Sequence, residues 1–389
     1  MAKLPLKLKA KLSKRKEDNF IRNLVEPLDL MDFTSNDYLG FARSKTIFSN
    51  AFKLLKKRGI TSNGATGSRL LSGNHSLYKE LEETLAESLG VPSALVFGSG
   101  YAANVGFFGS VPQRGDFVFF DELIHASIRD GIKMGNAKSY KFKHNDLEDL
   151  KDRCLSKCNG TTDEVEIYIV TESVFSMDGD SPDLRKLSNF CVQNGFNLIV
   201  DEAHAIGVFG EMGKGKVVEL GLQKEVFASI ITFGKALGCH GAAILGSGEL
   251  KDYLVNFARS FIYTTALPPH SIATIIEAYH YLMSSKGVDS RERLKENIIY
   301  FKSRVNLKGL DSFFIPSYSA IQSCILPGNR QVGSIAKNIQ DVGFDVKPIF
   351  SPTVPKGKER LRFCLHSFNT KKEIEKSLEI LSYNLNVYG

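Results

Sequence analysis

The sequence contains no run of 18 or more apolar residues, and this absence argues against a membrane-spanning helix. The N-terminus does not combine a basic start with an apolar stretch and a small-residue cleavage site, so we expect a cytoplasmic protein. The six cysteines include no Cys-x-x-Cys pair, and Cys154 and Cys158 have no second Cys or His pair nearby. We therefore expect reduced thiols and no metal site.

Acidic residues are absent from the first 16 positions, which carry seven lysines and arginines. The chain has 50 basic and 43 acidic residues, so without these seven the rest of the chain is neutral. Leu4, Leu6, Leu8 and Leu12 interleave with the lysines, which favours a solvated amphipathic helix over a transit peptide or a nucleic-acid patch. We expect no nucleic-acid partner. A site near this arm that receives an anionic, phosphate-bearing substrate is a further hypothesis.

The middle of the chain alternates short apolar runs with helical patterns. Segments such as Ser76–Leu89 repeat apolar residues every four positions, as helices do. The runs expected as buried strands are Ala94–Phe97, Phe117–Phe120, Glu166–Thr171, Asn197–Val200, Ser229–Phe233 and Ala242–Leu245. This alternation predicts an α/β fold with a mainly parallel sheet covered by helices on both faces.

The pattern changes after about residue 275, where we expect a smaller α+β domain. Its predicted elements are a helix over Ile272–Met283, strand-like Ser319–Leu326, Asp345–Phe350 and Arg360–Leu365, and a terminal helix over Lys371–Tyr383. We divide the chain into an N-terminal segment, residues 1–45, a large domain, residues 46–275, and a small C-terminal domain, residues 276–389.

Two residues at predicted strand ends point to a chemistry. Asp201 ends one strand in the motif Asp-Glu-Ala-His, and Lys235 closely follows the next strand. Ligands of parallel sheets bind at such strand ends. A lysine that forms an imine and an acid that keeps a ring nitrogen protonated are what pyridoxal 5′-phosphate (PLP) requires of a protein. A helicase or ATPase would need an upstream Gly-x4-Gly-Lys-Ser/Thr loop, which is absent.

Weaker signals accompany this pair. Gly98-Ser-Gly100-Tyr101 follows a predicted strand and opens a helix, where backbone amides suit a phosphate, but it lacks the third glycine of a dinucleotide-binding loop. His125 follows another strand, and at that position it would stack on a flat cofactor. Ser176, and Thr264 with Thr265, offer hydroxyls for a cofactor ring or a phosphate. Each of these segments, taken alone, is equally consistent with an ordinary turn or loop.

Taken in order, eight segments resemble the α-oxoamine synthases, which are fold-type I PLP enzymes. The resemblance runs from about residue 8 to the C-terminus, and its motifs lie at natural spacing. The matching segments are Asn36–Gly40, Gly64–Arg69, Ser99–Asn104, Asp121–Ser127, Ser173–Asp180, Asp201–Gly210, Thr232–Gly238 and Tyr263–Pro269. The resemblance implies a large domain with a mostly parallel seven-stranded sheet, a smaller α+β domain, and a homodimer with a shared active site.

The resemblance also implies roles for individual residues. Catalysis would use Lys235 as the Schiff-base lysine, Asp201 against the pyridine nitrogen and His125 over the ring. The residues implied to hold PLP are Gly100, Tyr101, His125, Ser176, Asp201, His204, Thr232, Lys235, Thr264 and Thr265, the two threonines reaching the partner subunit's phosphate. The residues implied to bind substrate are Arg22, Asn36, Thr353 and Arg362, where the Arg362 guanidinium would grip the amino-acid carboxylate.

Within the family, Thr232–Ala243 and Ser351–Gly357 are most similar to the biotin-pathway branch. That branch condenses L-alanine with a pimeloyl thioester of coenzyme A or acyl carrier protein, with loss of carbon dioxide. Glycine C-acetyltransferase, 5-aminolevulinate synthase and serine palmitoyltransferase are the sister activities. A PLP aminotransferase and a non-catalytic PLP-fold subunit remain as alternatives, although such subunits usually lose the lysine that is present here as Lys235.

Overall fold

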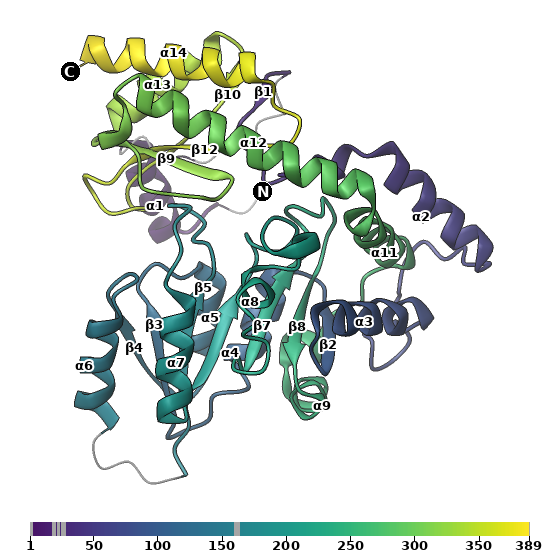
Figure 1. The fold of residues 1–389 in the computed structure, drawn as a ribbon. Coiled ribbons are helices and arrows are strands. Elements are labelled where there is room, and N and C mark those ends of the chain that lie inside the picture. Colours follow the sequence, from purple (N-terminus) through teal and green to yellow (C-terminus); the bar gives the residue numbers. More distant parts are fainter. Residues whose placement is uncertain (1–2, 18–20, 22–23, 25–28, 159–163, 389) are drawn as a thin grey trace.

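The computed structural model describes residues 3–17, 21, 24, 29–158 and 164–388. A large sheet with helices on both sides forms one part of the molecule, and a smaller sheet with its own helices lies against the strand ends (Figure 1). The strands of the large sheet are β2 (Ser93–Phe97), β3 (Phe117–Asp121), β4 (Lys138–Phe142), β5 (Ile167–Glu172), β6 (Asn197–Asp201), β7 (Ala228–Thr232) and β8 (Ala242–Gly246).

The seven strands are arranged in the order β2-β8-β7-β6-β5-β3-β4. Strands β7, β6, β5, β3 and β4 run parallel, whereas β8 is antiparallel to both β7 and β2. The register places Asp201 of β6 beside Glu172 of β5 at the carboxyl ends of their strands. The predicted α/β class and mainly parallel sheet are therefore confirmed. The carboxyl ends of the strands, where ligands were predicted to bind, carry two adjacent carboxylates.

Apolar side chains alternate between the two faces of this sheet, as the two-residue period of a strand requires. Val170 of β5 faces one side with Phe107 and Ile128 from the helices there, whereas Ile169 faces the other side with Leu187. The covering helices are α3 (Ser76–Leu89), α4 (Gly100–Phe108), α5 (Ala126–Met134), α6 (Leu147–Cys158), α7 (Leu184–Asn194), α8 (Lys216–Glu219), α9 (Gly248–Phe257), α10 (Arg259–Ile262) and α11 (Pro269–Met283).

The smaller part is built around a three-stranded antiparallel sheet in the order β11-β12-β9. Strand β1 pairs in parallel with β10, so the segment around residue 31 belongs to the C-terminal sheet region in space. The elements of this part are β1 (Met31–Asp32), β9 (Ile321–Ile325), β10 (Phe344–Asp345), β11 (Lys347–Ile349), β12 (Arg360–Cys364), α12 (Ser285–Leu307), α13 (Asn329–Asp341) and α14 (Lys371–Tyr388). One apolar cluster runs from Ile276 of α11 to Phe363 of β12 and joins the two parts.

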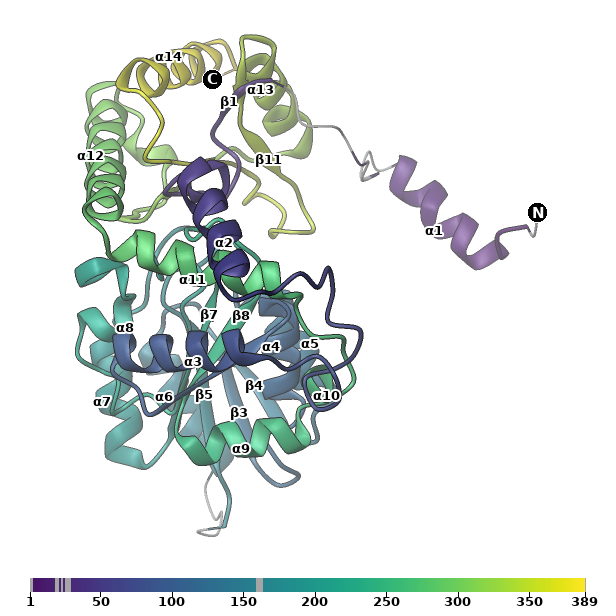
Figure 2. The same cartoon turned by 90° about the vertical axis from the view of Figure 1, so that its right-hand side faces the viewer.

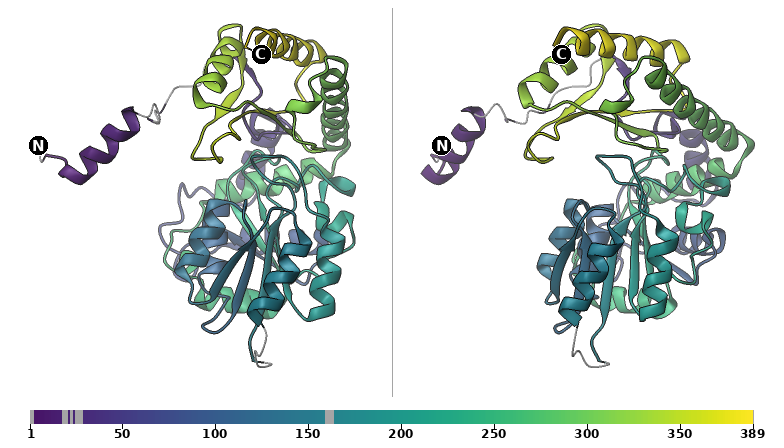
Figure 3. Two further views of the ribbon diagram at one scale, coloured as in Figure 1. Left: turned by 90° about the vertical axis from the view of Figure 1, so that its left-hand side faces the viewer. Right: turned by 60° about the vertical axis from the view of Figure 1, so that its left-hand side comes forward.

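Two helices from the N-terminal region have different surroundings. Helix α2 (Lys45–Lys57) packs on α11, whereas α1 (Leu6–Glu17) buries no residue and projects away from the body (Figures 2 and 3). No helix in the described part of the chain combines the length and the apolar character needed to cross a bilayer. The domain division at residues 45 and 275 stays a proposal; residue 275 lies within α11, and Ser284 separates α11 from α12.

Candidate active site

Lys235 lies in the loop, residues 233–241, that joins β7 to β8, and its carbonyl accepts from the Gly238 amide at 2.8 Å to close a turn. Its Nζ is 2.7 Å from Nε2 of His204. Gly238 makes the turn possible, because its φ of 62° is unfavourable for other residues and a Cβ there would lie 2.1 Å from the Ala42 nitrogen. Burial lowers the pKa of Lys235 to about 8, against the opposing effect of Asp201 and Glu172. A substantial fraction of the amine is therefore neutral, and nucleophilic, near physiological pH.

Asp201 is the last residue of β6, and two donors orient its carboxylate. Oδ1 accepts a hydrogen bond from the Ala203 amide at 2.9 Å, and Oδ2 accepts one from Nδ2 of Asn104 at 3.0 Å. Each carboxylate oxygen has two lone pairs, so Oδ2 keeps a site for one further donor. The carboxylate is therefore held by neutral partners while its charge stays available to a cationic group in the pocket.

A chain of hydrogen bonds runs behind Lys235. Nδ1 of His204 is 2.7 Å from the Tyr38 hydroxyl, which donates to Oδ1 of Asn36 at 3.1 Å. Burial, followed by the positive charges of Lys235 and Arg362, holds the pKa of His204 well below its usual value. A neutral His204 accepts from Lys235 at Nε2 and donates from Nδ1 to Tyr38. This arrangement keeps the lysine amine directed at the pocket.

His125 precedes helix α5 at the opposite side of the pocket. Its Nδ1 accepts from the Ser127 amide at 3.2 Å, so the remaining proton of the neutral ring lies on Nε2. Its backbone amide donates to the Glu172 carboxyl at 2.6 Å. Burial and the neighbouring Asp201 raise the pKa of Glu172 to about 8, and burial lowers the pKa of His125. The imidazole is thus uncharged and held at both its ring and its backbone.

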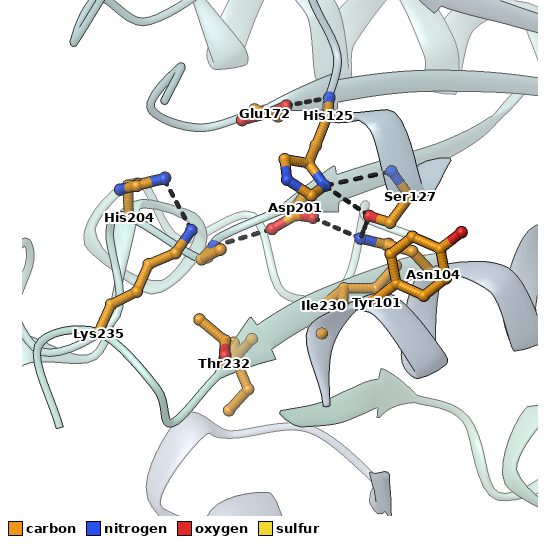
Figure 4. Close-up of a pocket in the computed structure, with 13 residues that line it drawn as sticks. Tyr101, Asn104, His125, Ser127, Glu172, Asp201, His204, Ile230, Thr232 and Lys235 are labelled. Carbon is orange, nitrogen blue, oxygen red and sulfur yellow. Dashed lines mark hydrogen bonds between the residues drawn. The ribbon is translucent and has the colours of Figure 1, made fainter. Parts of the chain in front are cut away.

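These residues enclose a cavity of about 200 Å³ (Figure 4). Lys235 and His204 lie on one side of it, and Tyr101 and Asn104 lie on the other. The lining residues are Gly100, Tyr101, Asn104, His125, Ser127, Glu172, Asp201, Ala203, His204, Ile230, Ile231, Thr232 and Lys235. The cavity therefore brings together seven of the predicted residues: Gly100, Tyr101, His125, Asp201, His204, Thr232 and Lys235.

The functional groups that line this cavity fit PLP. Lys235 supplies an amine for the aldehyde, Asp201 has a free acceptor site for the ring nitrogen, and the flat imidazole of His125 lies nearby. Helix α4 begins at Gly100, and the Ser99 side chain and carbonyl accept the Ala102 and Ala103 amides, which leaves the Gly100 and Tyr101 amides available to an anion. The side-chain oxygen Oδ1 of Asn104 is buried without a hydrogen-bond partner at the cavity wall, as expected for a site that receives a polar ligand.

Arg362 brings two further predicted residues together. This buried side chain on β12 donates from Nε to the Ser176 carbonyl at 2.7 Å and from Nη2 to Oδ1 of Asn36 at 3.0 Å. Asn36 also accepts from Tyr38, so Arg362 belongs to the same polar network as His204. Three segments from distant parts of the chain therefore meet next to Lys235. The Ser176 side chain itself does not line the cavity.

The other predicted residues lie apart from this cavity. Thr264 and Thr265 line a separate recess together with Arg69, which contacts Glu82 and stacks on the Tyr78 ring. Thr353 is exposed in the turn that follows β11. Arg22 lies outside the described residues. The geometry of one chain thus groups most of the residues expected to hold the ring, with Asn36 and Arg362 joined to them through Tyr38 and His204, and leaves Thr264, Thr265 and Thr353 apart.

Sequence reasoning assigned no role to several residues of the site. Asn104 and Ser127 are linked at 3.0 Å through the Asn104 amide, and both lie at the ends of motifs already singled out. Glu172 ends the strand before Ser173–Asp180, and Tyr38 lies inside Asn36–Gly40. The signal that could have identified these four residues was their position within or next to a motif. Their side-chain types alone do not indicate a site, because they are common in turns.

Comparisons with known proteins identify the family. The family model described as "Aminotransferase class I and II" matches residues 28–381. The chain is 39% identical to an 8-amino-7-oxononanoate synthase of Emericella nidulans over 95% of this chain and 93% of the relative. It is 37% identical to a protein of the same name from Geotalea daltonii, over 93% and 90% of the two chains.

Solved structures are similar over almost the whole chain. A serine palmitoyltransferase from S. paucimobilis, solved with PLP and myriocin, has a TM-score of 0.89 at 26% identity, with 99% of both chains covered. The 8-amino-7-oxononanoate synthase of Francisella tularensis has a TM-score of 0.77 at 30% identity, with 92% of this chain and 98% of that chain covered. The TM-score is therefore higher for the serine palmitoyltransferase, whereas the sequence identity is higher for the 8-amino-7-oxononanoate synthases.

Proposed function

Because this chain belongs to the aminotransferase class I and II family and its cofactor is PLP, we propose that it is an 8-amino-7-oxononanoate synthase of biotin biosynthesis. Such an enzyme condenses L-alanine with a pimeloyl thioester of coenzyme A or acyl carrier protein, and releases the thiol and carbon dioxide. The observation that carries the proposal is the 39% identity over 95% of the chain to a protein of that name. Substrate choice depends on side chains, so identity outweighs backbone likeness here.

Lys235 is the central catalytic residue of the proposal. Bound PLP supplies a ring that absorbs the negative charge developing at the α-carbon of the amino acid. The Nζ amine of Lys235 holds the cofactor covalently before substrate arrives, and it then takes the α-proton of the amino acid. A pKa of about 8 suits both tasks, because the amine is readily either neutral or protonated.

Asp201 and His125 support this chemistry from two directions. The Asp201 carboxylate keeps the cofactor's ring nitrogen protonated, and Asn104 and the Ala203 amide hold it in place for that purpose. The His125 imidazole, which lines the cavity, would stack on the cofactor ring. Gly100, Tyr101 and Thr232 would hold the phosphate end, and His204 would bind the ring hydroxyl together with Ser176, whose side chain would have to turn towards the cavity.

Arg362 binds the amino-acid carboxylate in this proposal. Its guanidinium uses Nε and Nη2 for Ser176 and Asn36, so these contacts orient the group that meets the substrate. Asn36 and Thr353, with Arg22, are the further substrate-binding residues. A planar guanidinium recognises a carboxylate through paired donors, which a lysine does not reproduce.

We place the protein in the cytoplasm as a homodimer without nucleic-acid or membrane partners. Thr264 and Thr265 then reach the phosphate bound in the partner subunit, which explains their separation from the cavity of their own chain. Large exposed apolar side chains, such as Phe48, Phe52 and Tyr263, are available to a subunit interface.

One assay separates the proposed activity from its alternatives. Purified PLP-loaded protein is incubated with L-alanine, glycine or L-serine and with pimeloyl or palmitoyl thioester, while thiol and carbon dioxide release are measured. We expect the highest kcat/KM with L-alanine and the pimeloyl donor. Preference for L-serine and palmitoyl thioester would instead support serine palmitoyltransferase, which the TM-score of 0.89 makes the second candidate. Amino-group exchange with a 2-oxo acid, without thiol release, would identify an aminotransferase.

The lowered pKa of Lys235 predicts how cofactor loading depends on pH. Imine formation requires the neutral amine, so the rate at which apoprotein takes up PLP should rise about tenfold from pH 6 to 7 and level off above about pH 8. The measurement is the growth of visible absorption after mixing across this pH range. A rate that keeps rising through pH 10, as for an ordinary lysine, would contradict the lowered pKa.

A further inference from the structure

His144 lies directly after β4 and between two carboxylates outside the cavity. Its Nδ1 is 2.9 Å from Oδ1 of Asp121, the buried last residue of β3, and its Nε2 is 2.8 Å from Oδ2 of Asp180. Asn145 donates to the same Asp180 oxygen at 2.8 Å, and the His144 ring packs edge-on against Phe175. The histidine therefore connects the edge of the large sheet to the loop that contains Asp180.

That loop, residues 173–180, also contacts the small sheet. Its carbonyl groups accept hydrogen bonds from Nε of Arg362 at 2.7 Å, from Ser323 at 2.6 Å and from Ser317 at 2.8 Å. Two backbone hydrogen bonds close it internally, between Phe175 and Asp180 at 3.0 Å and between Gly179 and Phe175 at 2.8 Å. Asp180 and the Ser176 carbonyl that accepts from Arg362 therefore belong to one internally hydrogen-bonded loop.

The charges around His144 favour its cationic form. The groups facing it are the carboxylates of Asp121, Asp180 and Asp178, of which Asp178 is paired with Arg360. Glu122 also approaches, accepting from the His144 amide at 3.5 Å. Burial lowers the pKa of His144, but the hydrogen bonds and charges of Asp121 and Asp180 outweigh it and raise the pKa to about 9. The bridge is a charge-assisted one at neutral pH.

We propose that His144 is a positioning residue for amino-acid binding: by holding Asp180 to Asp121, it fixes the loop that orients Arg362. This inference rests on the proposed function, which assigns Arg362 to the substrate carboxylate. His144 does not line the cavity and touches neither Lys235 nor Asp201 among the described contacts. Its effect should therefore appear in the binding of the amino acid and much less in the chemical step.

The test is a double-mutant cycle on the PLP-loaded enzyme. His144→Gln should raise the KM for L-alanine about tenfold and change kcat by less than about threefold, since a mispositioned Arg362 weakens carboxylate binding. Arg362→Lys should raise this KM more strongly, because lysine lacks the Nε contact to the loop. If His144 acts through Arg362, the double variant should have nearly the KM of Arg362→Lys alone. Multiplying effects would overturn the inference.

Two further variants protect this result from misinterpretation. His280→Gln removes an exposed histidine on α11 that has a similar carboxylate neighbour, Glu277 at 3.6 Å, and should leave KM unchanged. If thermal melting shows that His144→Gln does not fold, the double variant His144→Gln, Asp180→Asn replaces it. Its two amide side chains leave one carboxylate fewer without a cationic partner. Wild-type KM in either folded variant would refute the role of His144, whereas lack of turnover in the wild-type enzyme would refute the proposed function instead.

Discussion

Replacing Lys235 with alanine is expected to eliminate the visible absorption of the imine between Lys235 and PLP and to reduce turnover at least about 10⁴-fold. The residue is assigned two tasks that no neighbour shares. Among the described residues it is the lysine that lines the cavity, and the proposal assigns its amine as the base for the α-proton. His204, the nearest basic side chain, has a pKa held well below its usual value and is engaged by Tyr38. It is therefore a poor replacement.

Two controls separate the covalent role from charge and folding. Lys235→Arg keeps a cation beside His204, but a guanidinium is never neutral in proteins and forms no imine, so it should lose absorption as well. Lys251→Ala removes a lysine of α9 that pairs with Glu82 outside the cavity and should keep both signals. Absorbance spectra and turnover at saturating substrate are the measurements. Wild-type-like absorption in Lys235→Ala would disprove the assignment.

Much of the large sheet could be predicted from sequence because its signals are local. The six apolar runs expected as strands correspond to β2, β3, β5, β6, β7 and β8, with no end shifted by more than one residue. Strand-end polar residues were predicted to meet, and Asp201 and Lys235 do lie at one cavity. Buried parallel strands have continuous apolar sequences, so both their existence and their ends can be recognised.

The elements that were not predicted, such as β4 and β1, depend on tertiary contacts that a sequence pattern does not contain. Strand β4, with the sequence Lys-Ser-Tyr-Lys-Phe, lies at the sheet edge and is largely exposed. It lacks the apolar run by which the buried strands were predicted. The pairing of β1 with β10 joins residues more than 300 positions apart. Glu172 and Asn104 became recognisable as site residues only when the register of β5 and β6 and the packing of α4 placed them beside Asp201.

Replacing Asp201 with asparagine is expected to leave the protein folded and loaded with PLP but to reduce kcat by about 10²- to 10⁴-fold. Asparagine does not carry the negative charge that stabilises a protonated ring nitrogen. Loss of one partner of a buried ion pair costs about 3–5 kcal/mol, and each 1.36 kcal/mol corresponds to about a tenfold change in rate. The loss should fall on the step that removes the α-proton, where the ring has to accept negative charge.

The surroundings of Asp201 explain why the fold should tolerate this change. The new side-chain oxygen can still accept from the Ala203 amide, as Oδ1 does now at 2.9 Å. The new amide would face Nδ2 of Asn104, but Oδ1 of Asn104 has no hydrogen-bond partner, so this side chain can rotate by half a turn and accept instead. Ser127 then turns its hydroxyl proton from Nδ1 of His125 to the rotated Asn104, and Nδ1 keeps the Ser127 amide as a donor. Nδ2 of Asn104 takes the place where its Oδ1 has no partner, so the number of unpaired buried groups is unchanged and the main loss is the charge.

This expectation has a matched test. Asp201→Asn and Asp183→Asn, the latter at the exposed N-cap of α7, are compared by thermal melting, PLP content and the rate of α-proton exchange of L-alanine with solvent deuterium. Asp183→Asn should exchange at the wild-type rate, and Asp201→Asn should be slowed by the same factor as kcat. Equal slowing of exchange and turnover would locate the effect of the charge at the ring nitrogen. Unchanged exchange in a folded, loaded Asp201→Asn enzyme would exclude that role and leave Asp201 as a residue that only orders Asn104 and the Ala203 turn.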